Sequence, residues 1–319
     1  MRNEAFLPTI ERICFNQLEN RPSWAKSTVT TALRSRRASS IRKPLYRKGE
    51  FYENVDIGPK TFSIEEQRMR FKALLKKQEL VDKYLPVGPK KPALRKKSKK
   101  YARQAAETTS TTTSTTTSTT TMSPTFTTVK PAAAAATASN WLVEGQLVPA
   151  SDMYYKSQQN STYFYMNALP VWKSIEEGNW KLVEEIVRST AGQLAVNLDA
   201  WTGGLDNLRY PDADGKEVEL SLLSDGSLSV PRYLYKYLHD PVHNYGLVFV
   251  TMNDPYLGTM TADDHLCTPL DACQAKYPQF KDATKGYTYC CAIDSSSDFA
   301  LVVADLGVPA FPSSRPFFS

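Results

Sequence analysis

The chain has 319 residues, of which 41% are hydrophobic, so its length allows one large globular domain or two smaller ones. It contains no run of about 18 apolar residues, which excludes a transmembrane helix. Its net charge of +6 is unevenly spread: residues 1–103 hold 26 Lys and Arg against 10 Asp and Glu, and residues 104–319 hold 13 against 23. A basic N-terminal third is typical of a segment that meets phosphates or anionic surfaces, or of a solvated, variable surface.

The first third of the chain predicts one strand and one helix. Residues 6–16 form a short apolar run that reads as a strand, and residues 26–60 are basic and irregular. Apolar residues recur at helical spacing from Ile64 to Leu85, with Ser63 placed as the N-cap and Pro86 ending the pattern. We therefore predict a helix over this segment.

A low-complexity segment follows at residues 86–139. It is rich in Lys and Pro at first, then almost wholly Thr and Ser over residues 108–128, and too polar to bury. We expect a disordered insertion in a single domain, so that 1–85 and 140–319 are two parts of one fold, rather than a linker after an independent N-terminal domain. Deleting Thr108–Thr128 should then leave the thermal unfolding midpoint nearly unchanged.

Beyond Trp141 the chain becomes globular. Ile175–Thr190 carries an apolar stripe at helical spacing and stops at Gly192, which predicts an amphipathic helix. The stripe consists of Trp180, Val183, Ile186 and Val187. Strands are predicted at Tyr163–Asn167, Glu217–Leu223 and Leu247–Met252, with turns at the Asp-Gly pairs 214–215 and 225–226.

Cysteine usage indicates an oxidising compartment. Four of the five cysteines lie in the last 55 residues, at positions 267, 273, 290 and 291. Because a bond between neighbouring Cys290 and Cys291 would be strained, we predict two disulfides that join each of them to Cys267 or Cys273. Cys14 is then unpaired in this chain or pairs outside it. The sequon Asn160-Ser161-Thr162 and the Thr-rich tract suit the same compartment.

Three spaced segments carry a family resemblance. They are Val143-Glu144-Gly145-Gln146-Leu147-Val148-Pro149, then Asn167-Ala168-Leu169-Pro170, then Glu176-Glu177-Gly178-Asn179-Trp180. In this order they resemble the DNA/RNA non-specific endonucleases of the ββα-metal type, most closely the arthropod branch. The resemblance extends over about two-thirds of the chain and includes Gly286–Cys291. It implies an α+β fold: a mixed sheet with the ββα-metal motif packed on it, plus a basic, low-complexity N-terminal arm and insertion.

The resemblance also implies roles for individual positions. The family's general-base His falls on Gln146, its phosphate-binding Arg on Glu144, and its metal-ligand Asn on Glu176. Asn167 matches the family Asn, and Glu184 matches the Glu on the following helix. Mg²⁺ is the cofactor, and DNA or RNA the partner, that the resemblance implies.

The substitutions at these positions change the expected chemistry. Imidazole serves as a base because its pKa lies near neutrality, whereas the carboxamide of Gln146 does not titrate. Glu144 places an anion where a phosphate should bind. His239 and His243 have the i, i+4 spacing of a metal pair, but Pro241 between them argues against a shared helix face, so we interpret both as structural.

Glu176 has two interpretations. A carboxylate is a good ligand for Mg²⁺ or Ca²⁺, and Glu184 lies further along the same predicted helix. Equally, Glu176 and Glu177 suit the first turn of a helix, where the helix dipole favours acids.

We therefore expect an endonuclease-like protein with impaired catalysis, a pseudoenzyme that keeps nucleic-acid or divalent-metal binding. The first alternative is an active Mg²⁺-dependent phosphodiesterase with an unconventional base. The second is a secreted, non-enzymatic scaffold or interaction protein, which the acidic globular part favours. The resemblance implies an extracellular protein, although residues 1–16 are no signal peptide, since Glu11 and Arg12 stand where its apolar core would lie.

Overall fold

The computed structural model describes residues 10–16, 18–31, 44–49, 57–86, 140–293 and 299. All of them belong to one compact unit, formed by Met1–Pro86 and Asn140–Ser319. The insertion expected at 86–139 lies outside the described residues, Pro86 apart, so its disorder stays a prediction.

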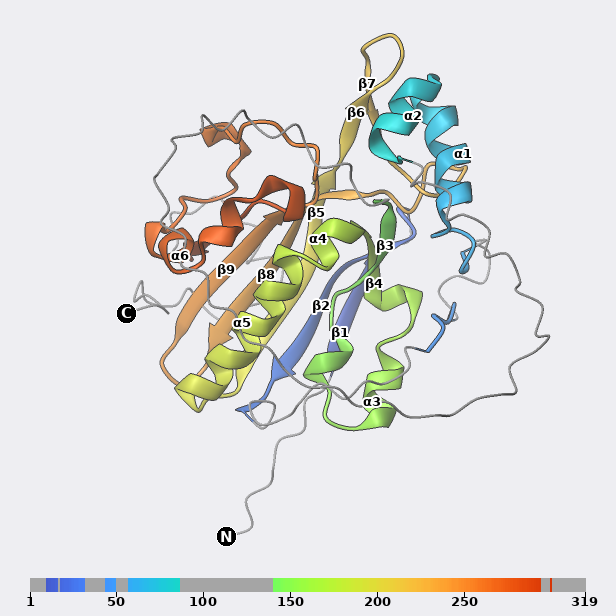
Figure 1. Ribbon diagram of the computed structural model, residues 1–319. Coiled ribbons are helices and arrows are strands. Elements are labelled where there is room, and N and C mark those ends of the chain that lie inside the picture. The colour runs from blue at the N-terminus through green and yellow to red at the C-terminus, as the bar shows by residue number, and fades with distance from the viewer. Residues whose placement is uncertain are drawn as a thin grey trace, which may run out of the picture. The chain divides into compact units, whose positions relative to one another are not determined.

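The unit is built on one large antiparallel sheet with the strand order β1-β2-β5-β8-β9-β10 among the described residues (Figure 1). Its strands are β1 (Ile10–Asn16), β2 (Arg21–Val29), β5 (Leu198–Asn207), β8 (Pro231–Asp240), β9 (Tyr245–Met252) and β10 (Thr288–Ala292). Every ladder in this order is antiparallel, which refines the mixed sheet that we expected. The α+β class is confirmed.

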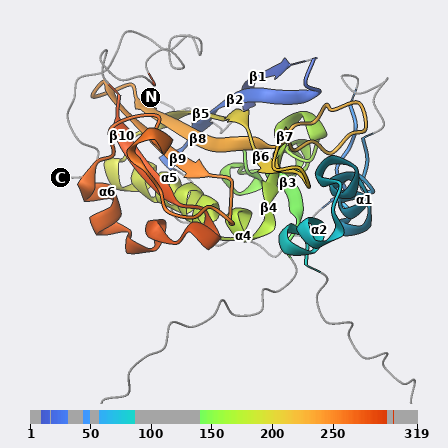
Figure 2. The same ribbon diagram turned by 90° about the horizontal axis from the view of Figure 1, so that it is seen from above.

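A β-hairpin and two helices form the ββα motif. The hairpin pairs β3 (Leu142–Gln146) with β4 (Ala168–Trp172). The helices that follow are α4 (Lys173–Glu176) and α5 (Asn179–Leu194). Both lie on one side of the main sheet, as Figure 2 shows with the sheet nearly edge on. The hairpin lies beside them and contacts β2 and β8.

The helix predicted over Ile175–Thr190 is interrupted between α4 and α5, at Gly178. A Cβ on this residue would lie 2.4 Å from the carbonyl oxygen of Ser174 and 2.8 Å from that of Lys285, so only glycine fits. The predicted apolar stripe is confirmed, because all four of its residues are buried. The helix continues past Gly192 and ends at Ala195 in the left-handed region, with φ of 53°.

The segment after Ser63 contains two helices where we predicted one. They are α1 (Ile64–Leu75) and α2 (Gln78–Tyr84), and the break falls at Lys76, whose φ is 57°. The Ser63 N-cap is confirmed, since its hydroxyl accepts a hydrogen bond from the backbone N–H of Glu66. The remaining elements are α3 (Lys156–Ser161), β6 (Arg209–Pro211), β7 (Glu217–Glu219) and α6 (Asp271–Lys276). Among the described residues, no helix is long and apolar enough to cross a membrane.

Two strand predictions were wrong. Tyr163–Asn167 contains an isolated bridge at Phe164 and a 3₁₀ turn at Tyr165–Asn167, and the strand begins only at Ala168. The alternating aromatic residues of Tyr163–Asn167 pack against Tyr46 instead: the ring centres of Tyr163 and Tyr165 lie 5.3 and 5.4 Å from that of Tyr46. Likewise Glu217–Leu223 is a strand only to Glu219. The predicted strand at Leu247–Met252 and both Asp-Gly turns are confirmed.

The two faces of the sheet have different chemistry, as β8 illustrates. Tyr233, Tyr235 and Tyr237 point into an aromatic cluster on the face away from α5. Leu238 belongs to the cluster shared with α5, and Lys236 alternates with the tyrosines to this helix-facing side. A lysine therefore stands on the buried side of the central sheet, where the ββα motif covers it.

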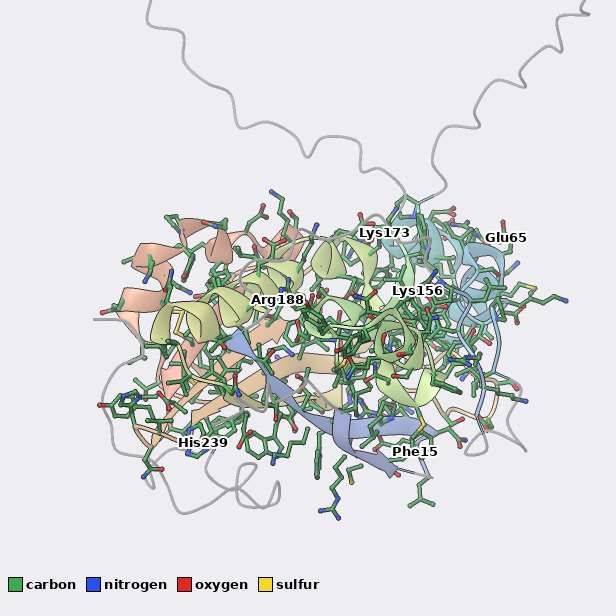
Figure 3. All side chains as sticks on the ribbon, turned by 90° about the horizontal axis from the view of Figure 1, so that it is seen from below. Phe15, Glu65, Lys156, Lys173, Arg188 and His239 are labelled. Carbon is green, nitrogen blue, oxygen red and sulfur yellow. A yellow bond between two sulfur atoms is a disulfide. The ribbon has the colours of Figure 1, made fainter. Side chains whose placement is uncertain are left out.

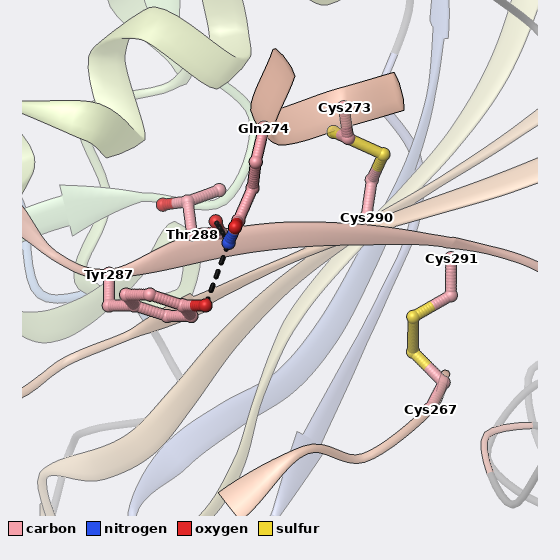
Figure 4. Close-up of a disulfide and its surroundings, with 7 residues drawn as sticks. All are labelled: Cys267, Cys273, Gln274, Tyr287, Thr288, Cys290 and Cys291. Carbon is pink, nitrogen blue, oxygen red and sulfur yellow. Dashed lines mark hydrogen bonds between the residues drawn. A yellow bond between two sulfur atoms is a disulfide. The ribbon is translucent and has the colours of Figure 1, made fainter. Parts of the chain in front are cut away.

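The disulfide prediction is confirmed. Cys267 bonds to Cys291, and Cys273 of α6 bonds to Cys290 (Figure 4). Because neighbouring residues of a strand point to opposite faces, Cys290 lies with the helix-side cluster and Cys291 with the aromatic cluster. One disulfide therefore fixes a segment against each face of β10. Cys14 is free of any disulfide.

Candidate active site

The β3–β4 hairpin and the helix after it position Glu144, Gln146 and Glu176, the residues expected at the family's site. Glu144 and Gln146 lie on β3 opposite Pro170 and Ala168, and Glu176 is the last residue of α4. A Cβ on Gly145 would lie 3.1 Å from Oε2 of Glu176. The glycine thus allows the Glu176 carboxylate to approach the backbone between Glu144 and Gln146, and the fold brings all three positions together.

The side chain of Gln146 is hydrogen-bonded at both ends. Its Oε1 accepts from the backbone N–H of Ala150 at 3.0 Å. Its Nε2 donates to Oγ1 of Thr162 at 2.9 Å and to the Thr162 carbonyl oxygen at 3.1 Å. The carboxamide therefore ties the end of β3 to the loop that leads away from it and to the loop that returns.

Asn167 is a buried structural residue. Its Oδ1 accepts from the N–H of Val148 at 3.1 Å, and its Nδ2 donates to the carbonyl oxygens of Val148 and Thr162 at 2.9 and 3.0 Å. Only 1% of its surface is exposed. It fixes the same loop that Gln146 holds, so its side chain is occupied by protein groups.

Tyr46 stands at the acidic end of this site. Its hydroxyl donates to the carbonyl oxygen of Glu144 at 3.3 Å. Burial raises the pKa of Tyr46 far above its usual range, and the negative charges of Glu144 and Glu176 raise it further. Tyr46 therefore stays protonated and serves as a hydrogen-bond donor beside two carboxylates. Nothing in the sequence pointed to it, because its place depends on a tertiary contact.

A buried ionic cluster lies behind the hairpin. Lys236, which is 1% exposed, donates through Nζ to Oγ1 of Thr202 at 2.5 Å and to the carbonyl oxygen of Leu147 at 3.4 Å. Burial lowers the pKa of Lys236, and the nearby Asp152 and Glu184 oppose this shift. The Leu147 contact connects the cluster directly to the residue after Gln146.

The second half of the cluster is carried by α5. Arg188 forms a 2.8 Å ion pair with the buried Asp152 and a 2.8 Å hydrogen bond with Oγ of Ser151. Burial raises the pKa of Glu184 to about 7, although the attraction of Lys236 works against it. Glu184 as a residue is half-buried, and its carboxyl group lies near the charges of Lys236, Asp152 and Arg188. Lys236 and Arg188 thus lie near the carboxylates of Asp152 and Glu184.

Sequence reasoning missed Lys236, Asp152 and Arg188. Lys236 did carry a signal, since it is the one charged residue between Arg232 and Asp240 in a run that is otherwise apolar or aromatic apart from His239. Asp152 and Arg188 carried none, because polar residues in a loop and on a helix are ordinary.

His239 and His243 have hydrogen-bonding partners away from Gln146. His239 lies on the opposite side of the sheet from Arg188 and Lys156, as Figure 3 shows, and its Nε2 lies 3.2 Å from Oδ1 of Asn244. His243 lies in the turn after β8, with Nδ1 2.7 Å from Oδ2 of Asp240. Each has a partner at the turn between β8 and β9, and the structural interpretation of both stays a prediction. Within the described ranges, no three His, Cys, Asp or Glu side chains gather as a metal-binding group.

Comparison with known proteins places this geometry in context. The family model described as DNA/RNA non-specific endonuclease matches residues 7–296. The chain is 31% identical over 161 residues to salivary protein Tsal1 of Glossina morsitans morsitans, which covers 50% of this chain and 40% of that protein. It is 31% identical over 157 residues to the salivary endonuclease of Lutzomyia longipalpis, which covers 49% and 38%. The matches thus span about two fifths of the length of these curated relatives.

Among solved structures, the crystal structure of the EndoG/EndoGI complex is similar with a TM-score of 0.40 and 13% sequence identity, over 83% of this chain and 76% of that chain. The matched family is one of metal-dependent nucleases, which act on nucleic acids.

Proposed function

Because the chain belongs to the DNA/RNA non-specific endonuclease family, we propose that it binds nucleic acid and hydrolyses it poorly. The observation that carries this proposal is the state of Gln146. Phosphodiester hydrolysis needs a base that takes a proton from water near neutral pH. A carboxamide does not titrate there, and both ends of this one are engaged by Ala150 and Thr162.

The charges around Gln146 support the second part of this proposal, poor hydrolysis. Glu144 and Glu176 lie close enough to Tyr46 for both to raise its pKa, so two carboxylates share one end of the hairpin. A phosphate about 4 Å from one such charge would be repelled by roughly 4 kcal/mol at an effective dielectric near 20. Lys236 and Arg188 offset little of this, since they interact with Glu184 and Asp152.

The residues present fit a hydrated Mg²⁺ only loosely. Glu176 would hold the ion through one carboxylate, which suits Mg²⁺ because it commonly keeps several waters and takes one or two protein ligands. When bound, the ion would neutralise charge on the phosphate and on the leaving oxygen. Nucleic-acid binding that rests on the basic residues of the chain does not require the Mg²⁺ ion.

The alternative to poor hydrolysis is an active enzyme in which Glu184 acts as the base. A pKa of about 7 suits general-base catalysis, because the group is then half ionised at neutral pH and still accepts a proton readily. The carboxyl group is desolvated, however, and lies near the charges of Lys236, Asp152 and Arg188. We favour the impaired site because the burial that raises the pKa of Glu184 also restricts its access to water.

We also propose an extracellular location. The relatives are salivary proteins, and the two disulfides suit an oxidising compartment. Peptide mapping of material from its native source, without reduction, would find both disulfides; free thiols at these four positions would place the protein in a reducing compartment.

Two measurements test the function. A gel shift with DNA and with RNA, in EDTA and in Mg²⁺, should show binding that weakens as salt rises, since phosphate contacts release counterions. Plasmid cleavage in Mg²⁺ should be very slow. No gel shift at low salt would favour a scaffold without nucleic-acid binding, and rapid cleavage abolished by Glu184→Ala would favour the rival enzyme.

A further inference from the structure

The sequon Asn160-Ser161-Thr162 lies at the end of α3, next to the Gln146 position. It is the single Asn-x-Ser/Thr sequence in the 319 residues. Asn160 is partly exposed, and Ser157 and Ser161 beside it are exposed. The carbonyl oxygen of Asn160 accepts from Nη2 of Arg47 at 2.9 Å and from the N–H of Tyr163 at 3.4 Å. None of the hydrogen bonds among the described residues uses its side-chain amide, which therefore has nothing to lose on modification.

The hydroxyl of Thr162 is in the opposite situation. It donates to the carbonyl oxygen of Gln159 at 2.8 Å and accepts from Nε2 of Gln146 at 2.9 Å. Thr162 is 0% exposed. Within one three-residue motif, the fold leaves the acceptor asparagine at the surface and encloses the hydroxyl that defines the motif.

We propose that Asn160 carries an N-linked glycan and that this glycan is added before the loop closes. The Thr162 hydroxyl first completes the acceptor sequence and, in the folded chain, forms the hydrogen bond to Gln146 that we call the clamp. This rests on the extracellular location given above. The donor is an oligosaccharide linked to a lipid through pyrophosphate. The amide nitrogen of Asn160 forms a bond to the anomeric carbon, the bond from that carbon to the pyrophosphate oxygen breaks, and the amide loses one proton as the lipid pyrophosphate leaves.

The order of events follows from burial. A glycosylation acceptor is read from the asparagine and from the hydroxyl two residues later. In the folded chain this hydroxyl is covered and has two hydrogen-bond partners. Transfer to the finished fold would require the loop to open and to release Gln146, so the modification belongs to the chain before folding.

The glycan has a defined place in the fold. Asn160 is two residues from Thr162, which limits the separation of their Cα atoms to about 7 Å. Thr162 in turn contacts Gln146 directly. A glycan on Asn160 therefore projects from α3 beside the position that the family uses for its base.

Three variants separate the glycan from the clamp. The full chain is secreted from insect cells behind an added, cleavable secretion signal, and its mass is measured before and after peptide-N-glycosidase treatment. Asn160→Gln should remove the glycan and leave the clamp intact. Thr162→Ser should keep both, because serine also completes the motif and also offers a hydroxyl. Thr162→Ala should remove the glycan and, by breaking the bond to Gln146, also lower the unfolding midpoint by several degrees below that of Asn160→Gln.

The result for the parent chain decides whether the proposal holds. We expect peptide-N-glycosidase to remove a glycan from the parent chain and to leave aspartate at position 160. Secreted chain that has both disulfides and an unmodified Asn160 would overturn the proposal, whatever its nuclease activity. To test the timing, unglycosylated chain is offered to a microsomal transferase together with the lipid-linked donor. One sample of the chain is folded, and the other is reduced and unfolded. Only the reduced, unfolded chain should be modified; equal modification of the folded chain would refute the order of events.

Discussion

The carboxamide nitrogen of Gln146 lies 2.9 Å from the hydroxyl oxygen of Thr162 and 3.1 Å from its carbonyl oxygen. Because Oε1 also accepts from Ala150, one side chain joins β3, the loop after it and the loop before β4. The side chain at position 146 therefore has a structural role in this chain.

The first prediction follows from this clamp. Gln146→Ala should lower the free energy of unfolding by about 2–3 kcal/mol, because it removes three hydrogen bonds and leaves the partly buried Ala150 N–H without its partner. Chemical denaturation measures the change. Gln78→Ala is the control, since Gln78 is exposed on α2 and, within the described part of the chain, its side chain bonds to the exposed Asp82. It should change stability by less than about 0.5 kcal/mol. Equal effects of the two substitutions would contradict the clamp.

The motif order made the site's location predictable from the sequence. Gln146 belongs to a motif on β3, and Asn167 belongs to a motif just before the partner strand β4. Glu176 precedes α5, a helix that was predictable from its apolar stripe. Short-range patterns of this kind can be recognised from the sequence because they reflect local backbone geometry. The same reasoning failed at Tyr163–Asn167, where aromatic alternation packs around Tyr46 rather than forming a strand.

The partners of the site were beyond sequence reasoning. Tyr46 is 98 residues from Glu144, and Lys236 is 89 residues from Leu147, so their contacts depend on the sheet and on the packing of the hairpin against it. Sequence did indicate that Gln146 cannot titrate. It did not reveal that the side chain would bond to Thr162, because that contact requires the loop to fold back.

The second prediction concerns the ion pair between Arg188 and Asp152. Its side chains are 18% and 3% exposed, so Arg188→Ala would leave a buried carboxylate without its main counter-charge. We expect a loss of about 3–5 kcal/mol in the free energy of unfolding. The pair Arg209–Glu219 is the control: its side chains are 44% and 49% exposed, and Arg209→Ala should cost at most about 1 kcal/mol. A small loss for Arg188→Ala would show that water solvates Asp152.

The third prediction is a pH dependence that arises from Glu184. Burial raises its pKa from 4.5 to about 7, with Lys236, Asp152, Arg188 and Glu185 also acting on it. As pH rises from 4.5 to 7, the carboxyl group ionises in the unfolded chain before it ionises in the folded one. This group therefore makes the parent chain less stable over that interval.

The variant Glu184→Gln lacks this titration. Its unfolding midpoint minus that of the parent should consequently increase between pH 5 and pH 8, whatever its sign at pH 5. Calorimetry at a series of pH values measures this difference. A difference for Glu184→Gln that stays flat or falls with pH would mean that its pKa is not raised in the folded chain.

The fourth prediction concerns the disulfides on the two faces of β10. They join residues 24 and 17 positions apart, and closing loops of this length stabilises a fold by about 3 kcal/mol each. Replacing Cys267 and Cys291 together by Ser should lower stability by about this amount and leave Cys273 bonded to Cys290. Peptide mapping without reduction should recover these two pairs; a peptide linking Cys267 to Cys290 would contradict the register of β10.

The last prediction concerns catalysis. In Mg²⁺ the chain should degrade plasmid DNA or RNA at least ~10²-fold more slowly than a family member with an intact base, since general-base catalysis is worth about 10²–10⁴. Gln146→His alone should recover little. The imidazole would still face Glu144, and it would break the bonds to Ala150 and Thr162, so the loop would lose part of its support.

Gln146→His combined with Glu144→Arg should recover more activity than the sum of the two single changes, because a base and a phosphate-binding cation act on the same transition state. Glu176→Asn, added third, tests whether the carboxylate beside Gly145 holds the metal unsuitably. Unfolding midpoints of all variants are measured in parallel, so that loss of the clamp is not mistaken for loss of chemistry. Rapid Mg²⁺-dependent cleavage by the parent chain, abolished by Glu184→Ala and unaffected by Glu185→Ala, would instead identify Glu184 as the base of a working enzyme.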